Sequence, residues 1–303
     1  MEVKSFIIDS PLDLIRIDKF LTNELDDYSR TQIQNLIKDD CVLVNDKNVK
    51  ANYILAMGDE IIVNIPDPVD IDIKKEDIPL DIYYEDDDVI VINKPSGMVV
   101  HPALGNYTGT VVNALMYHCK DLSGINGVNR AGIVHRIDKD TSGLIVCCKS
   151  DLAMKSLSHQ FLEKTVDRKY IAICYGVINH NLGRIDAPLG RDPENRKRYA
   201  IVDDGKHAVT NFRVLERFKE YSLLELSLET GRTHQIRVHM KYIGHPVVGD
   251  PLYGPRNVIG DHGQYLHAET LGFTHPRTGK RLEFTSPLPD FFQEFLESLR
   301  NNG

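Results

Sequence analysis

A carboxylate between two apolar runs is the part of this sequence best suited to chemistry. Asp138 lies in the segment GIVHRIDKDTSGLIVCCKS, residues 132–150, in which Ile133-Val134 and Leu144-Ile145-Val146 are typical of strand cores. The intervening DKDTSG consists almost entirely of turn-forming residues. Arg136 precedes Asp138 by two positions and would share its face on an extended chain. A carboxylate kept ionised in such a position can act as a nucleophile or a base.

Simpler interpretations of Asp138 have to be weighed. An isolated Asp in a turn usually accepts local hydrogen bonds. A kinase-like interpretation of the preceding residues fails, because the Asp stands one position late and the sequence has no Gly-rich phosphate loop. A glycosidase needs a second carboxylate across the sugar. Asp140 is too near in sequence to be an obvious partner, and distant acids remain open. Spacing alone therefore favours a structural role for Asp138.

The residues around Asp138 resemble a known signature. His135-Arg136-Ile137-Asp138, followed by Thr141-Ser142-Gly143, is similar to the catalytic motif of RluA-type pseudouridine synthases, which isomerise uridine in structured RNA. The family usually has Leu at the position of Ile137. The resemblance implies that Asp138 is the essential nucleophile and that Arg136 contacts the RNA. The attack on C6, the capture of C1′ and a glycal route all remain open.

Two further segments resemble motifs of the same family. In EDDDVIVINKPSGMVVHP, residues 85–102, we expect a strand at Val89–Ile92, a turn at Lys94–Gly97 and a short strand at Met98–Val100. The segment TGRTHQIRVHMKYIGHPVVGDPLYG, residues 230–254, is predicted to form a turn, a helix and a loop.

The helix of the third motif has predicted ends and an apolar stripe. Thr233 is the expected cap, Gly244 the expected end, and Ile236, Met240 and Ile243 the core stripe. The resemblance implies that Arg237 meets the catalytic Asp. A helix Arg is otherwise a surface ion pair of little energetic value. The three motifs stand in the family's order, which argues against that alternative.

Helices are expected on both sides of the Asp138 segment, near residues 109–118 and 151–163, the latter capped by Ser150. A strand is expected to begin at Lys169–Ile173. A strand Tyr such as Tyr170 usually packs half-buried with its hydroxyl satisfied. The resemblance instead implies that Tyr170 is an active-site residue.

Residues 16–40 are predicted to form two short helices, with Ser29 capping the second. With the apolar alternation at 42–44 and 61–63, residues 14–66 resemble an S4 domain, a small RNA-binding module. Cys41 and Asp46 occupy turn positions where that family commonly has Gly. The resemblance implies an RNA-facing side; the alternative is a solvated helix face. The implied RNA-facing residues are Arg16, Lys19, Arg30 and Lys38.

The net charge of −8 is concentrated in one segment. Residues 67–90 hold ten acids against Lys74 and Lys75, and the remainder balances 34 basic with 34 acidic side chains. RNA binding depends on where basic residues cluster, not on the total. The densest cluster lies within residues 191–206, beside Tyr199. It is interpreted either as an RNA-gripping loop or as a disordered surface loop.

Five cysteines without a C-x-x-C pair, no leading apolar segment and no bilayer-length apolar run predict a cytoplasmic protein without disulfides or a zinc site. His234 and His239 do not have the spacing of a helical zinc site, and we expect structural or RNA-facing roles. Cys147 and Cys148 should point to opposite faces of a strand.

Together these features predict an α+β protein. An S4 domain at residues 1–66, an acidic linker at 67–81 and a pseudouridine synthase domain at 82–303 with a mixed, largely antiparallel central sheet are expected. The implied function is isomerisation of uridine in structured RNA, most simply large-subunit ribosomal RNA, by a monomer without a cofactor or metal. Arg232 is expected to join the RNA-binding residues. The competing hypotheses are an RNA-binding factor that retains the fold and a nucleosidase that releases free base.

Overall fold

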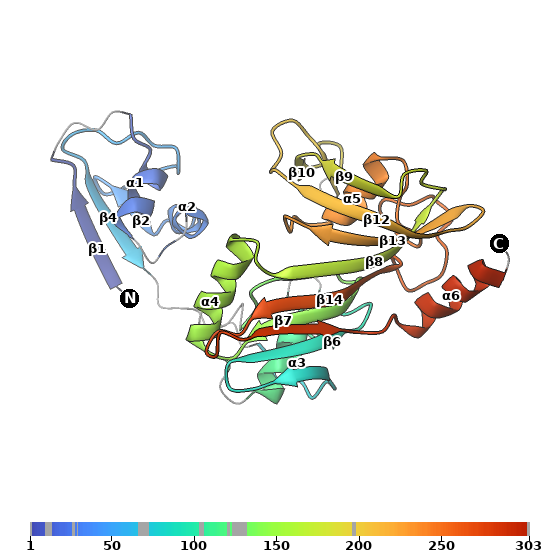
Figure 1. The fold of residues 1–303 in the computed structure, drawn as a ribbon. Helices are drawn as coiled ribbons and strands as arrows, with labels where there is room; N and C mark the ends of the chain where they lie inside the picture. Colours follow the sequence, from blue (N-terminus) through green and yellow to red (C-terminus); the bar gives the residue numbers. More distant parts are fainter. Residues whose placement is uncertain are drawn as a thin grey trace. The chain divides into compact units, whose positions relative to one another are not determined.

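The computed structural model describes residues 2–9, 14–25, 28, 30–65, 73–102, 106–119, 122, 132–195 and 198–301 (Figure 1). The chain divides into two compact units, residues 1–70 and 71–303. Within the described ranges, no helix has the length and apolar character needed to cross a bilayer. The expected boundaries at residues 66 and 81 stay a prediction.

The first unit is a four-stranded antiparallel sheet with two helices. In chain order it comprises β1 (Glu2–Ile7), α1 (Ile17–Glu24), α2 (Arg30–Lys38), β2 (Val42–Val44), β3 (Lys47–Asn48) and β4 (Glu60–Ile65), with sheet order β1-β4-β2-β3. Both predicted helices are present, and their periodic apolar residues form the core with β2 and β4. Ser29, the expected cap, lies outside the described residues.

The hairpin between β2 and β3 turns through Asn45 and Asp46, which both adopt positive φ, 50° and 61°. A two-residue turn of this kind matches the twist of the flanking strands, and Asn and Asp tolerate the conformation. Asp46 therefore performs the backbone task for which Gly is usual.

The second unit is built on a nine-stranded sheet. Its order is β5-β6-β7-β14-β8-β13-β12-β9, and β15 pairs with β14. The pair β7–β14 is parallel and the other pairs are antiparallel, which confirms the predicted mixed, largely antiparallel sheet. The bounds are β5 (Asp81–Glu85), β6 (Val89–Lys94), β7 (Ser142–Cys148), β8 (Asp167–Tyr175), β9 (Leu182–Asp186), β12 (Val209–Arg217), β13 (Tyr221–Leu228), β14 (Leu266–Thr274) and β15 (Arg281–Thr285).

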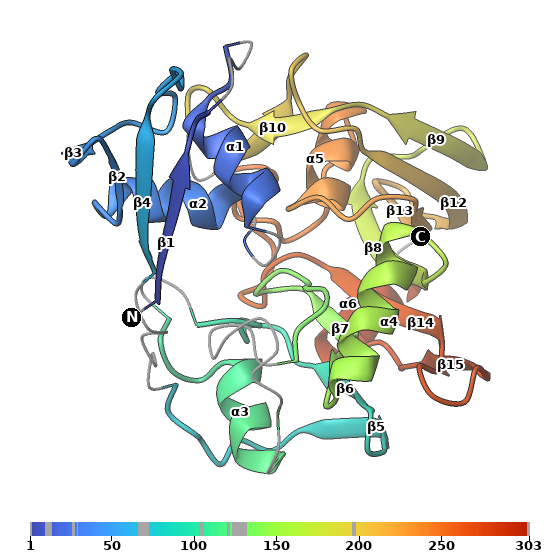
Figure 2. The same cartoon turned by 90° about the vertical axis from the view of Figure 1, so that its left-hand side faces the viewer.

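Helices cover both faces of this sheet. Alternation along the strands sends Ile145 and Cys147 to the side of α3 (Val111–His118) and α5 (Gln235–Tyr242), while Val146 and Cys148 pack with α4 (Asp151–Leu162). Figure 2 shows α3 and α4 on either side of β6 and β7. The helix α6 (Asp290–Asn301) packs on β8 and β13 on the side away from α3. The opposed orientation expected for Cys147 and Cys148 is confirmed.

Two of the expected strands are absent from the described structure. Ile133 forms one isolated bridge with Cys147, and Val134 leaves the sheet. Val99 and Val100 accept hydrogen bonds from the backbone of α3 at 3.0 and 3.2 Å, so the 98–100 segment anchors that helix instead of pairing in the sheet.

Ser142 and Gly143, expected in the turn after Asp138, begin β7. Gly143 has φ +116°, and a Cβ atom there would lie 2.3 Å from the carbonyl oxygen of Ala268 on β14. The parallel pair at the centre of the sheet therefore requires glycine at this position.

Residues 73–80 form no regular secondary structure, and they are hydrogen-bonded to the rest of the second unit. Asn113 of α3 donates to the Lys74 carbonyl at 2.8 Å and accepts from the Glu76 amide through its own carbonyl at 3.1 Å. Ile73 is buried in the same core as α3. The described part of the acidic segment is therefore packed against the sheet unit.

Candidate active site

Asp138 lies in an irregular segment between the Ile133 bridge and β7. Its side chain is 18% exposed and faces a cavity of about 550 Å³. Arg136, Tyr170, Arg232 and Arg237 also line this cavity, so four residues assigned separately from sequence share one wall with Asp138. Cavities of this size hold small ligands or single extruded groups.

The turn after β6 is hydrogen-bonded to the loop that carries Asp138. Lys94, which is fully buried, donates through Nζ to the carbonyl oxygens of Pro95, Met98 and Lys139 at 2.7, 2.8 and 2.8 Å. The Gly97 amide donates to the Lys139 carbonyl at 3.0 Å. Burial lowers the pKa of Lys94 to about 7, opposed by the charges of the two nearby aspartates, Asp140 and Asp138. The sequence identified this turn as part of a motif, but it did not reveal that the buried Lys94 would connect the turn to the Asp138 loop.

The residue that begins the signature motif anchors the other side of the loop. His135 Nε2 accepts a hydrogen bond from the Val146 amide at 3.0 Å, and its ring stacks on Phe161 with centroids 4.6 Å apart. Burial lowers the pKa of His135 to about 3, and the charge of Arg168 lowers it further. His135 is therefore a neutral ring that fixes the start of the motif to β7 and α4.

Arg237 joins two carboxylates. Its Nη1 donates to Asp138 Oδ2 at 2.9 Å, while Nε and Nη2 donate to Asp250 Oδ2 and Oδ1 at 2.7 and 2.9 Å. The Arg237 side chain is 5% exposed and that of Asp250 is fully buried. Both carboxylates raise the pKa of Arg237 against the effect of burial, so the guanidinium stays charged. The geometry pairs the Asp138 carboxylate with a positive charge and fixes its orientation.

Sequence reasoning missed Asp250, although it stands in the third motif, in GDPLYG. On an extended chain Arg136 would share the face of Asp138, whereas the resemblance implied that Arg237 meets this carboxylate. In the structure Arg136 is exposed and the ion pair of Asp138 is made with Arg237. A two-residue spacing puts side chains on one face only where the chain is a strand, and this segment is not one.

The start of α5 differs from the prediction. His234, not Thr233, is the N-cap; it has φ 57° and makes no capping hydrogen bond through its side chain. Gln235, the first residue of the helix, fixes the preceding turn, because its Oε1 accepts from Thr230 Oγ1 and from the Arg232 amide at 2.7 and 3.0 Å. Gly244, with φ +86°, follows the end of α5 as expected.

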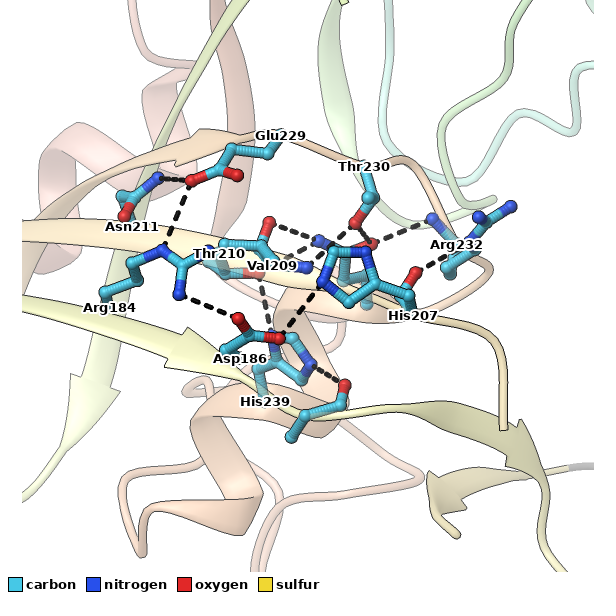
Figure 3. A network of polar contacts seen from close by, with 12 residues as sticks. Arg184, Asp186, His207, Val209, Thr210, Asn211, Glu229, Thr230, Arg232 and His239 are labelled. Carbon is cyan, nitrogen blue, oxygen red and sulfur yellow. Dashed lines mark hydrogen bonds and ion pairs between the residues drawn. The ribbon is translucent and has the colours of Figure 1, made fainter. Parts of the chain in front are cut away.

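The amide group of Gln235 also ties α5 to β12. Its Nε2 donates to Val209 O and Thr210 Oγ1 at 2.9 and 3.1 Å, and His239 contacts Thr210 Oγ1 at 2.9 Å. Figure 3 shows Thr230, Val209, Thr210 and His239 in this network. These three contacts fix the position of α5 on the sheet, and with it the position of Arg237.

Tyr170 extends from β8 into the cavity wall and is 6% exposed. Burial raises the pKa of its hydroxyl, and the charge of Asp138 raises it while that of Arg168 lowers it. Tyr170 is therefore a neutral phenol beside the carboxylate. Such a ring can stack on a planar group held in the cavity.

The basic stretch at 191–206 contains a two-stranded hairpin, β10 (Leu189–Arg191) and β11 (Tyr199–Ile201). The Arg191 guanidinium lies 4.6 Å from the ring centre of Tyr199. A second cavity of about 580 Å³ adjoins the first, with Gly231 and Arg232 in both walls and Lys206 on its other side. Arg196 and Lys197 lie outside the described residues. The described part of this basic segment includes a strand pair and borders the site.

In the first unit, Lys19 and Lys38 are exposed, whereas Arg16 and Arg30 are bound to a buried acid. The guanidinium Nη2 atoms of Arg16 and Arg30 lie 2.9 and 3.0 Å from Asp18 Oδ2. Asp18 is fully buried, and hydrogen bonds from Gln34, Arg16 and Arg30 lower its pKa despite its burial. Part of the positive charge of the two arginines is therefore compensated within the fold.

Asp86, Asp88 and His275 lie close enough together to bind a cation. Arg277 already binds Asp88 at 2.6 and 2.8 Å, and the amides of Asp88 and Val89 donate to Asp86. These groups connect β6 with the turn between β14 and β15. Their contacts are those of a structural network.

Comparison with known proteins gives a separate match for each of the two units. The RNA pseudouridylate synthase family model matches residues 88–242, and the S4 domain model matches residues 15–61. An uncharacterized RNA pseudouridine synthase of Bacillus subtilis (strain 168) is 59% identical over 288 residues, with 95% of each chain covered. The ribosomal large subunit pseudouridine synthase D of Neisseria meningitidis serogroup A is 47% identical over 305 residues, covering 96% of this chain and 80% of the relative.

Among solved structures, human RNA pseudouridylate synthase domain containing 1 superposes with a TM-score of 0.58 at 25% identity, covering 73% of this chain and 95% of the human one. The matched segments include the Asp138 loop and the helix that carries Arg237. The chain is therefore an RNA pseudouridine synthase, a member of the RNA pseudouridylate synthase family with an S4 domain ahead of the catalytic one.

Proposed function

We propose that this enzyme converts specific uridines of large-subunit ribosomal RNA to pseudouridine, with Asp138 as the nucleophile. The observation that carries the chemical part is the Asp138 carboxylate, held by buried Arg237 in the wall of a cavity of about 550 Å³. The choice of RNA is supported by the relative at 47% identity, which is named a ribosomal large subunit pseudouridine synthase.

The isomerisation is balanced without an oxidant or reductant. The N1–C1′ bond of uridine breaks, the base turns, and a C5–C1′ bond forms. The hydrogen on C5 leaves as a proton, and N1 gains one. Ionised Asp138 begins the sequence by attacking the nucleotide, a role for which a carboxylate needs to be anionic and correctly oriented.

The other cavity residues divide the remaining tasks. Arg237 orients the Asp138 carboxylate through the ion pair between the two side chains. Neutral Tyr170 stacks against the flipped base and moves a proton at a late step. Extruding a base costs a few kcal/mol. Phosphate contacts from Arg136 and Arg232, which are exposed at the cavity, offset that cost.

The first unit adds RNA affinity. Lys19 and Lys38 are exposed and form no ion pair with the described residues, and the partly exposed guanidiniums of Arg16 and Arg30 add to the positive charge. An enzyme of this kind works where ribosomal RNA is made and assembled, so we place it in the cytoplasm as a monomer.

The decisive experiment uses Asp138→Asn, which keeps the shape of the side chain and removes its charge. RNA labelled with tritium at C5 of uridine should release tritium with the wild-type protein and none with the variant, while RNA affinity stays within about fivefold. Release by the variant at the wild-type rate would refute the assignment of Asp138.

Two further measurements separate the alternatives. Free uracil in the reaction mixture would indicate a nucleosidase rather than an isomerase. Mapping pseudouridine across total RNA with and without the protein should reveal changes in large-subunit ribosomal RNA. Changes confined to other RNA would refute the proposed substrate.

A further inference from the structure

His234 begins α5 in a left-handed conformation, with φ 57° and ψ 17°. Residues other than glycine seldom adopt it, and Asn, Asp and His are the side chains that do so most readily. The ring is 17% exposed in the wall of the Asp138 cavity. The backbone conformation thus places an imidazole, and not merely a helix start, beside the carboxylate.

One nitrogen of this ring has a partner that determines its protonation. His234 Nδ1 lies 2.8 Å from the hydroxyl oxygen of Tyr253. That oxygen also accepts a hydrogen bond from the Tyr199 amide at 2.8 Å. The Tyr253 hydroxyl has one proton of its own to donate, and Nδ1 is the acceptor in reach. When the Tyr253 hydroxyl donates to Nδ1, a neutral His234 carries its own proton on Nε2, and this is the tautomer on which the inference below is built.

The other nitrogen faces the nucleophile. His234 Nε2 lies 4.0 Å from Asp138 Oδ1, while Arg237 binds the second oxygen, Oδ2, at 2.9 Å. Among the described residues, Oδ1 accepts no hydrogen bond. Burial lowers the pKa of His234, and the charges of Arg237 and Arg136 lower it as well, against the opposite effect of Asp138 and Asp250. A neutral ring with a proton on Nε2 is thus directed at an unoccupied carboxylate oxygen.

We propose that His234 is a positioning residue, whose Nε2–H donates to Asp138 Oδ1 once the uridine is bound. The inference rests on the proposed role of Asp138 as nucleophile. The 4.0 Å separation has to close by about 1 Å, and hydrogen bonds of active sites are often long before the substrate binds. Arg237 and His234 then hold one carboxylate oxygen each, so that the nucleophile cannot rotate.

The arrangement also links the basic hairpin to the nucleophile. Tyr199 belongs to β11, and its ring meets the His234 ring edge-on with the ring centres 5.6 Å apart. The Tyr199 amide donates a hydrogen bond to the Tyr253 hydroxyl oxygen. A chain of contacts therefore leads from β11 through Tyr253 and His234 to Asp138. In Figure 2, as in Figure 1, β10 lies beside α5.

Two substitutions at His234 separate a side-chain role from a backbone role. His234→Asn suits the left-handed backbone but is too short to reach Asp138. His234→Gln suits that backbone less well, yet its amide nitrogen can replace Nε2–H. In single-turnover reactions at saturating enzyme, Gln should react within about threefold of wild type and Asn at least about tenfold slower, with RNA affinity unchanged. The opposite order, or wild-type rates for both, would overturn the proposal.

The protonation of His234 provides a readout other than activity. The ¹⁵N chemical shifts of the wild-type ring should show a neutral imidazole with its proton on Nε2, and Tyr253→Phe should abolish that preference. A proton on Nδ1 in the wild type would overturn the proposal whatever the rates are.

Asp138→Asn is measured in the same series. If that variant remains active, the proposed function fails and the present inference fails with it. If Asp138→Asn is inactive while His234→Asn reacts at the wild-type rate, only the role of His234 is refuted.

Discussion

Replacing Arg237 by Lys tests the site most directly, because it preserves charge and removes geometry. The guanidinium makes three hydrogen bonds to two carboxylates, one to Asp138 and two to fully buried Asp250. The ammonium group of Lys cannot reproduce the planar arrangement of N–H donors that the guanidinium of Arg237 presents. At best it donates once to each carboxylate, so at least one charge-assisted bond is lost.

The structure sets the size of both effects. One to two lost bonds to a charged group correspond to about 1.5–6 kcal/mol of unfolding free energy, at about 1.5–3 kcal/mol for each bond. Misorientation of Asp138 should lower the single-turnover rate at least about tenfold, which is about 1.4 kcal/mol of barrier. RNA affinity should change far less, since orientation matters mainly at the chemical step.

Urea unfolding and single-turnover kinetics at saturating enzyme measure the two effects separately. Arg184→Lys is the matched control, because Arg184 also contacts two carboxylates, Asp186 and Glu229, but its side chain is 51% exposed (Figure 3). Solvent screens such a pair, so the control should retain its unfolding midpoint and rate. A wild-type rate for Arg237→Lys would show that Arg237 does not orient the nucleophile.

Three further predictions concern other parts of the molecule. Gly143→Ala should lower the unfolding free energy in urea by at least about 2 kcal/mol, because its Cβ would meet the backbone of Ala268; an unchanged midpoint would contradict the close approach of β7 and β14. Lys19→Gln with Lys38→Gln should reduce the slope of log affinity against log salt by up to about 2, and an unchanged slope would exclude both from the RNA interface. The pKa of Asp86 is lowered to about 2 by hydrogen bonds from the Val89 amide, Tyr84 and neighbouring groups, despite partial burial. Asp86 therefore stabilises the fold at pH values above 3.8, the usual pKa of Asp, and this stabilisation is lost as the pH falls towards 2. Asp86→Asn should therefore flatten the decline of the urea midpoint over this range, and equal slopes would refute it.

Local patterns in the sequence were sufficient for most elements. The apolar periodicity of α1, α2 and α4 predicted their existence and buried faces, because side-chain period follows directly from backbone geometry. Ser150 accepts from the Ala153 amide at 3.2 Å, as a capping residue should. These features depend on neighbours within a few residues.

The remaining features depend on distant partners. Asp250 binds Arg237 across a loop, and the three carbonyl acceptors of Lys94 come from two separate segments. Thr233 had the right chemistry for a cap, but the helix begins one residue later, after His234, and Gln235 ties its start to the Arg232 amide and to β12. No local pattern signals this attachment, since it depends on a strand more than twenty residues away.

The position of β14 in the sheet determines when the site can form during synthesis. This strand lies between β7 and β8, so it joins the half of the sheet that carries the Asp138 loop to the half that carries Tyr170. Chains are made from the amino terminus, and domains fold as units. A nascent chain that ends at Asp250 already contains Asp138, Tyr170, His234 and Arg237, yet it lacks the strand, Leu266–Thr274, that brings the two halves together. The enzyme therefore gains its nucleophile in working geometry only after the residues up to Thr274 have left the ribosome.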